Sequence, residues 1–401
     1  MKKLMLLGGI RYLLPVIEAA HKYGYHVITV DYVPTNIAHR YSDEFYNISI
    51  LDKNAVLELA QKLRIDGILS FGVDPGVVTA AYVAERMGLS FQCSYEAACI
   101  LQDKSRFRQF LAENGFNVPK AKGYASKVEA LNDVDLFSWP VMVKPVDSAG
   151  SKGVSKVEDI EKLSSAIDYA LVESHNGHFI IEDFLEKVGA SSDCDCFSVD
   201  GELTFCSFND QFFDNSALNP YTPSAYTWPS TIPQWAQKEL FQELQRLMNL
   251  LECRTGVYNI ETRLCTNGKV YIMEVSPRGG GNRLSEMMGM ISGQNIIDNV
   301  VRAAVGEPID TIIQPTYNGY WAEVILHSKT DGIFESIKID KKVEEDYLVQ
   351  NDIWVVAGEQ VQGFTGANTT IGTLILKFNS QHEMAECLSH QDCWLQINIK
   401  E

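Results

Sequence analysis

Long apolar runs are missing from this sequence. No stretch reaches the about 18 consecutive apolar residues that a membrane-spanning helix needs, so no transmembrane segment is predicted. The apolar N-terminal run stops at Gly8-Gly9 without a small-residue cleavage site, and it is therefore interpreted as a first strand and not as a signal peptide. The nine cysteines, an odd number without a C-x-x-C pair, are typical of reduced thiols in the cytosol. We therefore expect a cytoplasmic protein without a membrane partner, with Cys194 and Cys196 in or near its core.

Basic residues are also scarce. The chain has 34 Lys and Arg against 52 Asp and Glu, which gives a formal net charge of −18. A protein that binds the phosphate backbone of nucleic acid needs a basic surface, so nucleic acid is not expected as a partner. A small anionic nucleotide remains compatible, provided that local cations and a divalent metal offset the overall field. With 401 residues, the chain is long enough for two or three domains.

Two nucleotide-binding fingerprints are absent. The residues after Gly8-Gly9 do not complete G-x-G-x-x-G, which disfavours NAD and the alternative of a nicotinamide oxidoreductase. The loop at 147–153 does not match the P-loop pattern G-x-x-x-x-G-K-[ST]. Gly8, Arg11 and Asp74 would still lie at the carboxyl ends of strands, where ligands bind to open sheets, although an ordinary strand-end turn explains Asp74 equally well.

Strands and helices alternate through residues 4–95. This rhythm predicts a small parallel sheet with right-handed crossovers. The expected elements are strands at 4–7, 27–30 and 67–71 and helices at 13–23, 55–63 and 77–87.

Later elements are more mixed. The segment 209–233 is rich in aromatic residues and has no Lys or Arg, and it is interpreted as a long loop that acts as a substrate lid. The tail at 310–401 contains no recognisable catalytic constellation and is expected to pack or dimerise. The other expected elements are a helix at 101–116 with Asp103 as N-cap, helices at 159–174, 234–251 and 285–305, a hairpin at 193–208, strands at 319–327, 354–357 and 373–378, and a helix near 381–388.

The stretch from Val257 to Glu286 carries the clearest chemical signal. Asn267-Gly268 predicts a two-residue type I′ hairpin turn, and counting outward from it places Glu261 opposite Glu274. Facing carboxylates repel each other, and a divalent cation between them relieves the repulsion. Oxygen ligands of this kind suit Mg²⁺ together with substrate phosphates. The following loop, with Arg278 before three glycines, offers a cation and backbone that can approach an anion closely.

Two lysines precede this hairpin. Lys104 lies in the first turn of an expected helix, where it is either a solvated surface residue or an anion contact. Lys144 ends an expected strand, directly before a loop of small residues whose N–H groups could cradle phosphates.

Taken in order along the chain, these features resemble the ATP-grasp superfamily, in particular its carboxylate–amine ligases such as L-amino-acid ligases, carbamoyl-phosphate synthases and phosphoribosylglycinamide synthetases. The resemblance implies an α/β and α+β protein with the ATP-grasp fold. It implies a parallel pre-ATP-grasp domain at 1–95, an ATP-grasp domain at 96–310 with a flexible lid lobe at about 120–185, and an α+β subdomain at 311–401. It also implies Mg²⁺, or Mn²⁺ in its place, together with ATP, and is compatible with a homodimer.

The resemblance assigns roles to individual residues. Catalysis would rest on Arg278 and Lys144, and the metal ligands would be Glu261, Glu274 and Ser276, where the serine replaces the asparagine of the family's E-x-N motif. The residues expected to bind ATP are Lys104, Lys144, Ser148, Gly150, Ser151, Gly153, Glu182, Asp183, Phe184, Leu185 and Glu186.

The implied reaction joins a small, amino-acid-like acid to an amine through an acyl phosphate. One alternative is a purine-pathway ligase for a phosphoribosyl substrate, which would need cations that the segment 209–233 does not contain. Another is a nucleotide-binding regulator without turnover, for which Ser276 in the metal motif is the support.

Overall fold

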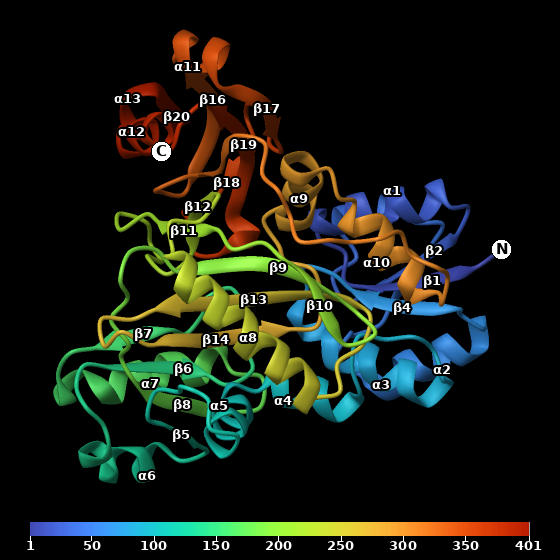
Figure 1. The fold of residues 1–401 in the computed structure, drawn as a ribbon, viewed down its shortest axis with the longest axis horizontal. Helices are drawn as coiled ribbons and strands as arrows, with labels where there is room; N and C mark the ends of the chain where they lie inside the picture. Colours follow the sequence, from blue (N-terminus) through green and yellow to red (C-terminus); the bar gives the residue numbers. More distant parts are fainter. Residues whose placement is uncertain (401) are drawn as a thin grey trace.

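The N-terminal part is a parallel four-stranded sheet in the order β3-β2-β1-β4. The computed structural model describes residues 1–400, and Figure 1 shows how its elements are arranged. The predicted sheet is confirmed, and β3 is added at its edge, where half-buried residues give little apolar signal. The elements are β1 (Lys3–Leu7), α1 (Leu14–Lys22), β2 (His26–Asp31), β3 (Glu44–Asn47), α2 (Lys53–Leu63), β4 (Gly67–Ser70) and α3 (Val77–Met87).

The helix predicted at 101–116 is wrong in its bounds. Two helices, α4 (Tyr95–Gln102) and α5 (Lys104–Glu113), meet at Asp103. The backbone of Asp103 is extended, and its carboxylate accepts hydrogen bonds from the N–H groups of Ser105 and Arg106. The predicted N-cap is therefore confirmed.

A small antiparallel sheet in the order β5-β8-β6-β7 follows. It has a hydrophobic core of its own, in which Val143 and Ile181 of the sheet pack against Leu163 and Ile167 of a helix. This sheet lies at the lower left of Figure 1, in green. Its elements are β5 (Ala121–Tyr124), α6 (Lys127–Asn132), β6 (Val141–Pro145), β7 (Ser155–Val157), α7 (Ile160–Glu173) and β8 (Phe179–Asp183).

The central sheet has the order β10-β9-β13-β14. The predicted hairpin at 193–208 forms from β9 and β10, and Cys194 and Cys196 are buried as expected. Helix α8 covers one face with Leu240, Leu244 and Leu247. The elements are β9 (Ser192–Val199), β10 (Glu202–Cys206), α8 (Gln234–Leu250), β13 (Gly256–Leu264) and β14 (Val270–Ser276).

The prediction of one long loop at 209–233 is wrong. The segment forms β11 (Asp210–Phe213) and β12 (Pro223–Trp228), joined by a shorter connection. The strand β12 pairs with a strand from the C-terminal part of the chain, and Tyr226 and Trp228 are 1% and 0% exposed because they pack in a hydrophobic core. These aromatic residues are core residues and therefore cannot serve as an exposed lid.

The helix predicted at 285–305 is interrupted. It forms α9 (Leu284–Ser292) and α10 (Ile296–Ala304), and Gly293 between them has a φ of +73°. A left-handed residue cannot continue an α-helix, which explains the break. Figure 1 shows α10 beside α1 of the N-terminal part.

The C-terminal part builds two sheets, ordered β11-β12-β15-β19-β17 and β18-β16-β20. The first combines residues 210–228 with residues 320–378, so it crosses the domain boundary predicted at 310–311. The strand predicted at 354–357 is wrong, since the edge strand ends at Ile353. The elements are β15 (Tyr320–His327), β16 (Gly332–Ile339), α11 (Lys341–Asp346), β17 (Leu348–Ile353), β18 (Gln360–Val361), β19 (Thr370–Phe378), α12 (Gln381–Ser389), α13 (Gln391–Trp394) and β20 (Leu395–Lys400). None of the helices in residues 1–400 is long and apolar enough to cross a membrane.

Candidate active site

Glu261 and Glu274 face each other across β13 and β14, as the sequence predicts. The predicted turn is nevertheless wrong. The N–H of Cys265 donates to the carbonyl of Lys269, so the loop has one more residue than a type I′ turn, and Leu264 pairs with Val270. A bulge next to Glu261 then shifts the register back by one residue. The two departures cancel each other, and the carboxylates end in the predicted positions.

Each of the two carboxylates has a basic neighbour. Arg263 donates to Glu261 Oε1 at 2.7 Å, and Lys104 Nζ lies 3.7 Å from Glu274 Oε2. Burial raises the pKa of Glu261, but Arg263 and Lys144 outweigh it and hold the pKa below its ordinary value. Both side chains remain about a third exposed, at 30% and 36%, so a ligand can reach them from solvent.

Sequence reasoning missed a third carboxylate in this row. Asp193 of β9 pairs with Glu261 from the other side, so acidic residues stand on three neighbouring strands. Burial and the charge of Glu261 raise the pKa of Asp193 to about 7. Its oxygens accept hydrogen bonds from Asn259 Nδ2 at 2.8 Å and the Tyr226 hydroxyl at 3.0 Å. The alternation Asp193-x-Asp195 was a visible signal, but the pairing of β9 with β13 was needed to interpret it.

Lys144 and Arg108 hold a buried carboxylate between them. Glu182 is 2% exposed, pairs with Lys144 through Oε1, and accepts from Arg108 Nε at 2.9 Å through Oε2. Arg108 also donates to the carbonyl of Met273 at 2.8 Å. Burial raises the pKa of Glu182, but the two cations outweigh it and lower the pKa to about 2. This ion triad joins the small sheet to the β13–β14 hairpin and holds Lys144 near Glu261.

The side chain of Glu182 is thus already used in ion pairing. The next two residues of the predicted adenine segment also have partners, since the N–H groups of Asp183 and Phe184 donate to the carbonyls of Lys120 and Pro140. Leu185 packs on the hairpin residues Tyr271 and Met273, and the carbonyl of Glu186 accepts from Thr266.

The loop at 147–153 is folded against its neighbours. Lys104 Nζ donates to the carbonyl of Ser148 at 3.0 Å, which links the loop to the ammonium group beside Glu274. Ser151 donates to the carbonyl of Tyr221 at 2.9 Å. Gly150 and Gly153 have φ values of +67° and +71°, which explains glycine at both positions.

Arg278 is occupied by Asp74 of the N-terminal part. Its Nε and a terminal nitrogen donate to the two oxygens of Asp74 at 2.9 and 2.7 Å. Ser276 also donates to Asp74, at 2.8 Å, and accepts from Gln102 at 2.8 Å. Burial raises the pKa of Asp74, but Arg278 outweighs it and lowers the pKa. Asp74 therefore positions Arg278 and Ser276, and it is more than a strand-end turn.

Close packing explains why glycines follow Arg278. A Cβ on Gly279 would lie 2.2 Å from the Phe71 ring, and one on Gly280 would lie 2.7 Å from Leu284. The N–H of Gly280 donates to Asp195 at 2.8 Å. Because this N–H already has a partner, Gly280 does not support the prediction that the backbone of this loop binds an anion.

Comparisons with known proteins point to one family. Residues 137–286 match the family model of the ATP-grasp domain. The formate-dependent phosphoribosylglycinamide formyltransferase of Synechococcus sp. (strain WH7803) is 26% identical over 314 residues, which are 77% of this chain and 78% of that protein. The carbamoyl phosphate synthase large chain of Clostridium beijerinckii is 24% identical over 294 residues, 72% of this chain, which spans only 27% of that relative's length.

Solved structures share the whole fold. L-amino acid ligase from Bacillus licheniformis superposes with a TM-score of 0.81 at 19% identity, covering 100% of this chain and 99% of that one. Phosphoribosylglycinamide synthetase from Anaerococcus prevotii gives a TM-score of 0.74 at 20% identity, covering 100% of both chains. At these identities the likeness establishes the fold, and the fold is the one that the sequence predicts.

Proposed function

Because residues 137–286 match the ATP-grasp domain, we propose that this chain is an ADP-forming ligase that joins a small carboxylic acid to an amine. The facing pair Glu261 and Glu274, with Lys104 beside it and Lys144 close enough to lower the pKa of Glu261, is the observation that carries this proposal. Two carboxylates can bind a divalent cation and nearby lysines can bind phosphate oxygens, and a metal-bound polyphosphate needs both.

The residues present fit Mg²⁺, or Mn²⁺ in its place. Glu261 and Glu274 would hold the ion, and Asp193 is a third oxygen donor within the same row. The ion would neutralise the charge of the ATP phosphates during phosphoryl transfer. The hydroxyl of Ser276 is engaged by Asp74 and Gln102, so the proposed site does not require it as a third ligand in place of asparagine.

The remaining roles follow from position. Lys104 and Lys144 would bind the phosphates, and the loop at 147–153 with Ser148, Gly150, Ser151 and Gly153 would cover them. Arg278, held by Asp74, would stabilise the negative charge of the transferred phosphoryl group. The segment Glu182–Glu186 would contact the adenine and ribose.

The proposed reaction has two steps. An oxygen of the acid attacks the γ-phosphorus of ATP, the bond to the β-phosphate oxygen breaks, and an acyl phosphate and ADP form. The lone pair of the amine then attacks the acyl carbon, phosphate leaves with the bonding electrons, and the amine gives up a proton. Both steps depend on positioning and charge neutralisation, and neither needs a protein nucleophile.

The segment 209–233 does not identify the acid. The aromatic residues thought to line a lid are buried in β12, so they no longer favour an amino-acid-like acid over others. The phosphoribosyl alternative still lacks cations in the segment 209–233. The regulator without turnover remains an alternative, and turnover itself distinguishes it from a ligase.

The test is ADP release with Mg-ATP and a panel of amino acids and other small acids, with hydroxylamine added to trap any acyl phosphate. We expect one class of acids to stimulate release, and Glu274→Ala to abolish the stimulation. Glu335→Ala removes an exposed carboxylate from β16 and serves as the control. A wild-type protein that binds Mg-ATP but releases no ADP above background with any acid would favour the regulator.

A further inference from the structure

The strand β15 carries a buried carboxylate without a partner. Glu323 is 0% exposed, and neither of its oxygens accepts a hydrogen bond from any group in residues 1–400. Burying a carboxylate without compensation costs several kcal/mol, and such groups are rare in folded proteins. Glu323 therefore indicates a partner that binds from outside the chain.

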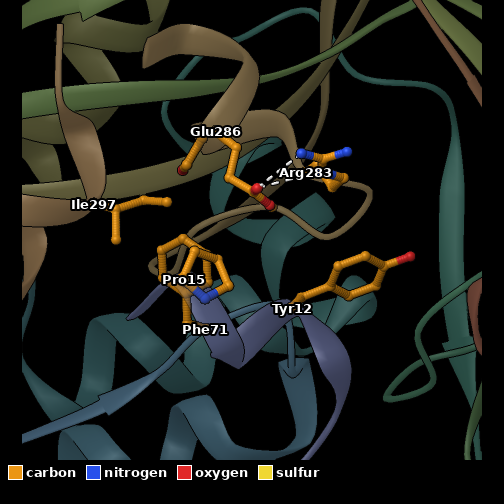
Figure 2. Close-up of a pocket in the computed structure, with 8 residues that line it drawn as sticks. Tyr12, Pro15, Phe71, Arg283, Glu286 and Ile297 are labelled. Atoms are coloured by element: carbon orange, nitrogen blue, oxygen red, sulfur yellow. Dashed lines mark hydrogen bonds and ion pairs between the residues drawn. The ribbon is translucent and has the colours of Figure 1, made fainter. Parts of the chain in front are cut away.

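Three distant parts of the chain surround this carboxylate. Its cross-strand neighbour on β12 is Tyr226. Glu323 also lies close enough to Tyr12 of the N-terminal part and to Arg283 of the loop after β14 to raise the pKa of both groups. Figure 2 shows the ion pair of Arg283 and Glu286 above Tyr12, at a narrow pocket that residues of the N-terminal part and of the segment after β14 line. The other face of β15 packs against the C-terminal core, so Glu323 faces the body of the protein.

The charges around Glu323 do not balance. Arg283 is bound by Glu286 at 3.1 Å and lies 3.8 Å from Asp352, so a single guanidinium serves three carboxylates. Arg283 also donates to Gln350 and Thr373, at 3.0 Å each. Burial, reinforced by Glu286 and opposed only in part by Arg283, holds the pKa of Glu323 well above its usual range. A second cation is what this cluster lacks.

A chain of hydrogen bonds connects the residues around Glu323 to the row of carboxylates formed by Asp193, Glu261 and Glu274. Tyr12 donates to Asn282 Oδ1 at 2.8 Å, Asn282 donates to the Tyr226 hydroxyl at 3.3 Å, and Tyr226 donates to Asp193 at 3.0 Å. Asp193 stands beside Glu261 in the sheet register. Tyr226 thus has Asp193 at its hydroxyl and Glu323 directly across the strand pair. A substrate bound at the row of Asp193, Glu261 and Glu274 would therefore lie within the length of one tyrosine side chain of Glu323.

We infer that Glu323 binds an ammonium group of the acid substrate, so that the ligase selects amino acids over acids without an amino group. This rests on the proposed function and names its substrate class. An ammonium group brings one positive charge and three N–H donors, enough to satisfy both oxygens of Glu323 and an adjacent hydroxyl. Asn282 and Arg283 have left-handed φ values of 50° and 59°, a form of strain that is concentrated at ligand sites.

The experiment compares matched acids: L-alanine with propionate, and L-leucine with 4-methylpentanoate. ADP release is measured for the wild type, for Glu323→Gln and for the exposed control Glu335→Gln. We expect the wild type to prefer both amino acids, and Glu323→Gln to lose about 100-fold in kcat/KM for them because a bound charge would remain unpaired. The rates with propionate and 4-methylpentanoate should not fall, and the control should behave as the wild type.

Ligand-induced thermal stabilisation in the presence of a non-hydrolysable Mg-ATP analogue gives a second readout that does not need turnover. Glu323→Gln replaces a buried carboxyl, whose pKa burial raises, by a neutral group of the same shape and is expected to fold, and Glu323→Met, of similar volume, repeats the test. Equal losses for both classes of acid, or no loss for amino acids, would overturn the inference and leave the proposed function standing. If no acid supports ADP release while L-alanine stabilises the wild type but not Glu323→Gln, the proposed function fails and the ammonium site is supported. The absence of both effects would overturn both.

Discussion

Replacing Glu182 with glutamine tests the ion triad that holds Lys144 in the site. The carboxylate is 2% exposed and the side chains of Lys144 and Arg108 are 16% and 5% exposed, so the variant leaves two cations in a poorly solvated position. Removing one partner of a buried ion pair typically costs about 3–5 kcal/mol.

The pKa of Glu182 gives an independent magnitude. Burial opposes the shift, but Arg108 and Lys144 lower the pKa from 4.5 to about 2. This gap corresponds to about 3 kcal/mol of stability at neutral pH. Because the folded-state pKa is the lower one, this stabilisation is complete above the unfolded pKa of 4.5 and is lost as the pH falls toward about 2.

The assay is urea unfolding of the wild type and Glu182→Gln at pH 7 and at pH 3. We expect the variant to lose about 3 kcal/mol at pH 7, and the difference between the two proteins to shrink at pH 3. Glu129→Gln breaks the exposed pair with Lys122 and should hardly change the unfolding free energy. A loss below about 1 kcal/mol at pH 7, or a difference that stays constant with pH, would refute the reasoning.

Two further predictions concern the acidic row and the glycine loop. Asp193→Asn should stabilise the ligand-free protein, because it relieves repulsion with Glu261, and should weaken Mg²⁺ binding in calorimetric titrations; unchanged Mg²⁺ affinity would remove Asp193 from the site. Gly279→Ala places a Cβ 2.2 Å from the Phe71 ring and should cost about 1–3 kcal/mol in chemical unfolding. Gly289→Ala in α9, where the nearest atom is 3.9 Å away, should instead be neutral or stabilising by up to about 1 kcal/mol, and equal effects of the two changes would contradict the packing argument.

Local patterns were sufficient for much of the fold. The βαβ rhythm of residues 4–87 and the N-cap at Asp103 depend on short-range periodicity and side-chain chemistry, and both are present in the structure. The errors arose where distant segments decide the outcome. Residues 223–228 are a strand because β15, almost a hundred residues later, pairs with them.

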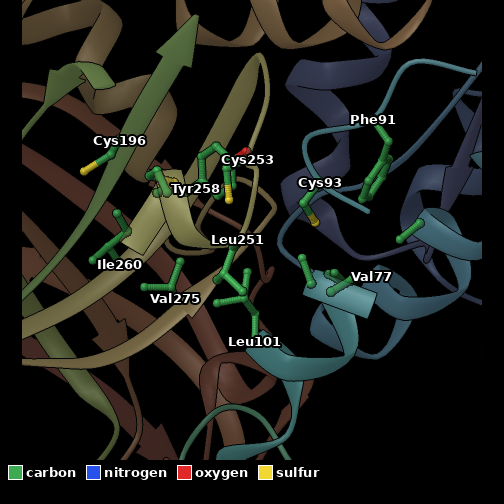
Figure 3. Close-up of a cluster of buried hydrophobic side chains, with 14 of the residues drawn as sticks. Val77, Phe91, Cys93, Leu101, Cys196, Leu251, Cys253, Tyr258, Ile260 and Val275 are labelled. Carbon is green, nitrogen blue, oxygen red and sulfur yellow. The ribbon is translucent and has the colours of Figure 1, made fainter. Parts of the chain in front are cut away.

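In the candidate site too, short-range patterns could be read from the sequence and long-range contacts could not. Glu261 and Glu274 could be paired by counting from a turn, although a longer loop and a bulge had to cancel. Asp193, Asp74 and Glu323 could not be placed, because their roles depend on how separate parts of the chain pack together. Figure 3 shows one such junction, where Val77 and Leu101 from the N-terminal helices meet Ile260 and Val275 of the β13–β14 hairpin in one core.

The central claim is that Glu261 and Glu274 together hold a metal-bound nucleotide. Calorimetric titration of ATP into the wild type and the double variant Glu261→Gln/Glu274→Gln, with and without Mg²⁺, tests it most directly. The account predicts that Mg²⁺ strengthens ATP binding in the wild type and has no such effect in the double variant. Mg-ATP binding of equal affinity and equal Mg²⁺ dependence in both proteins would contradict it.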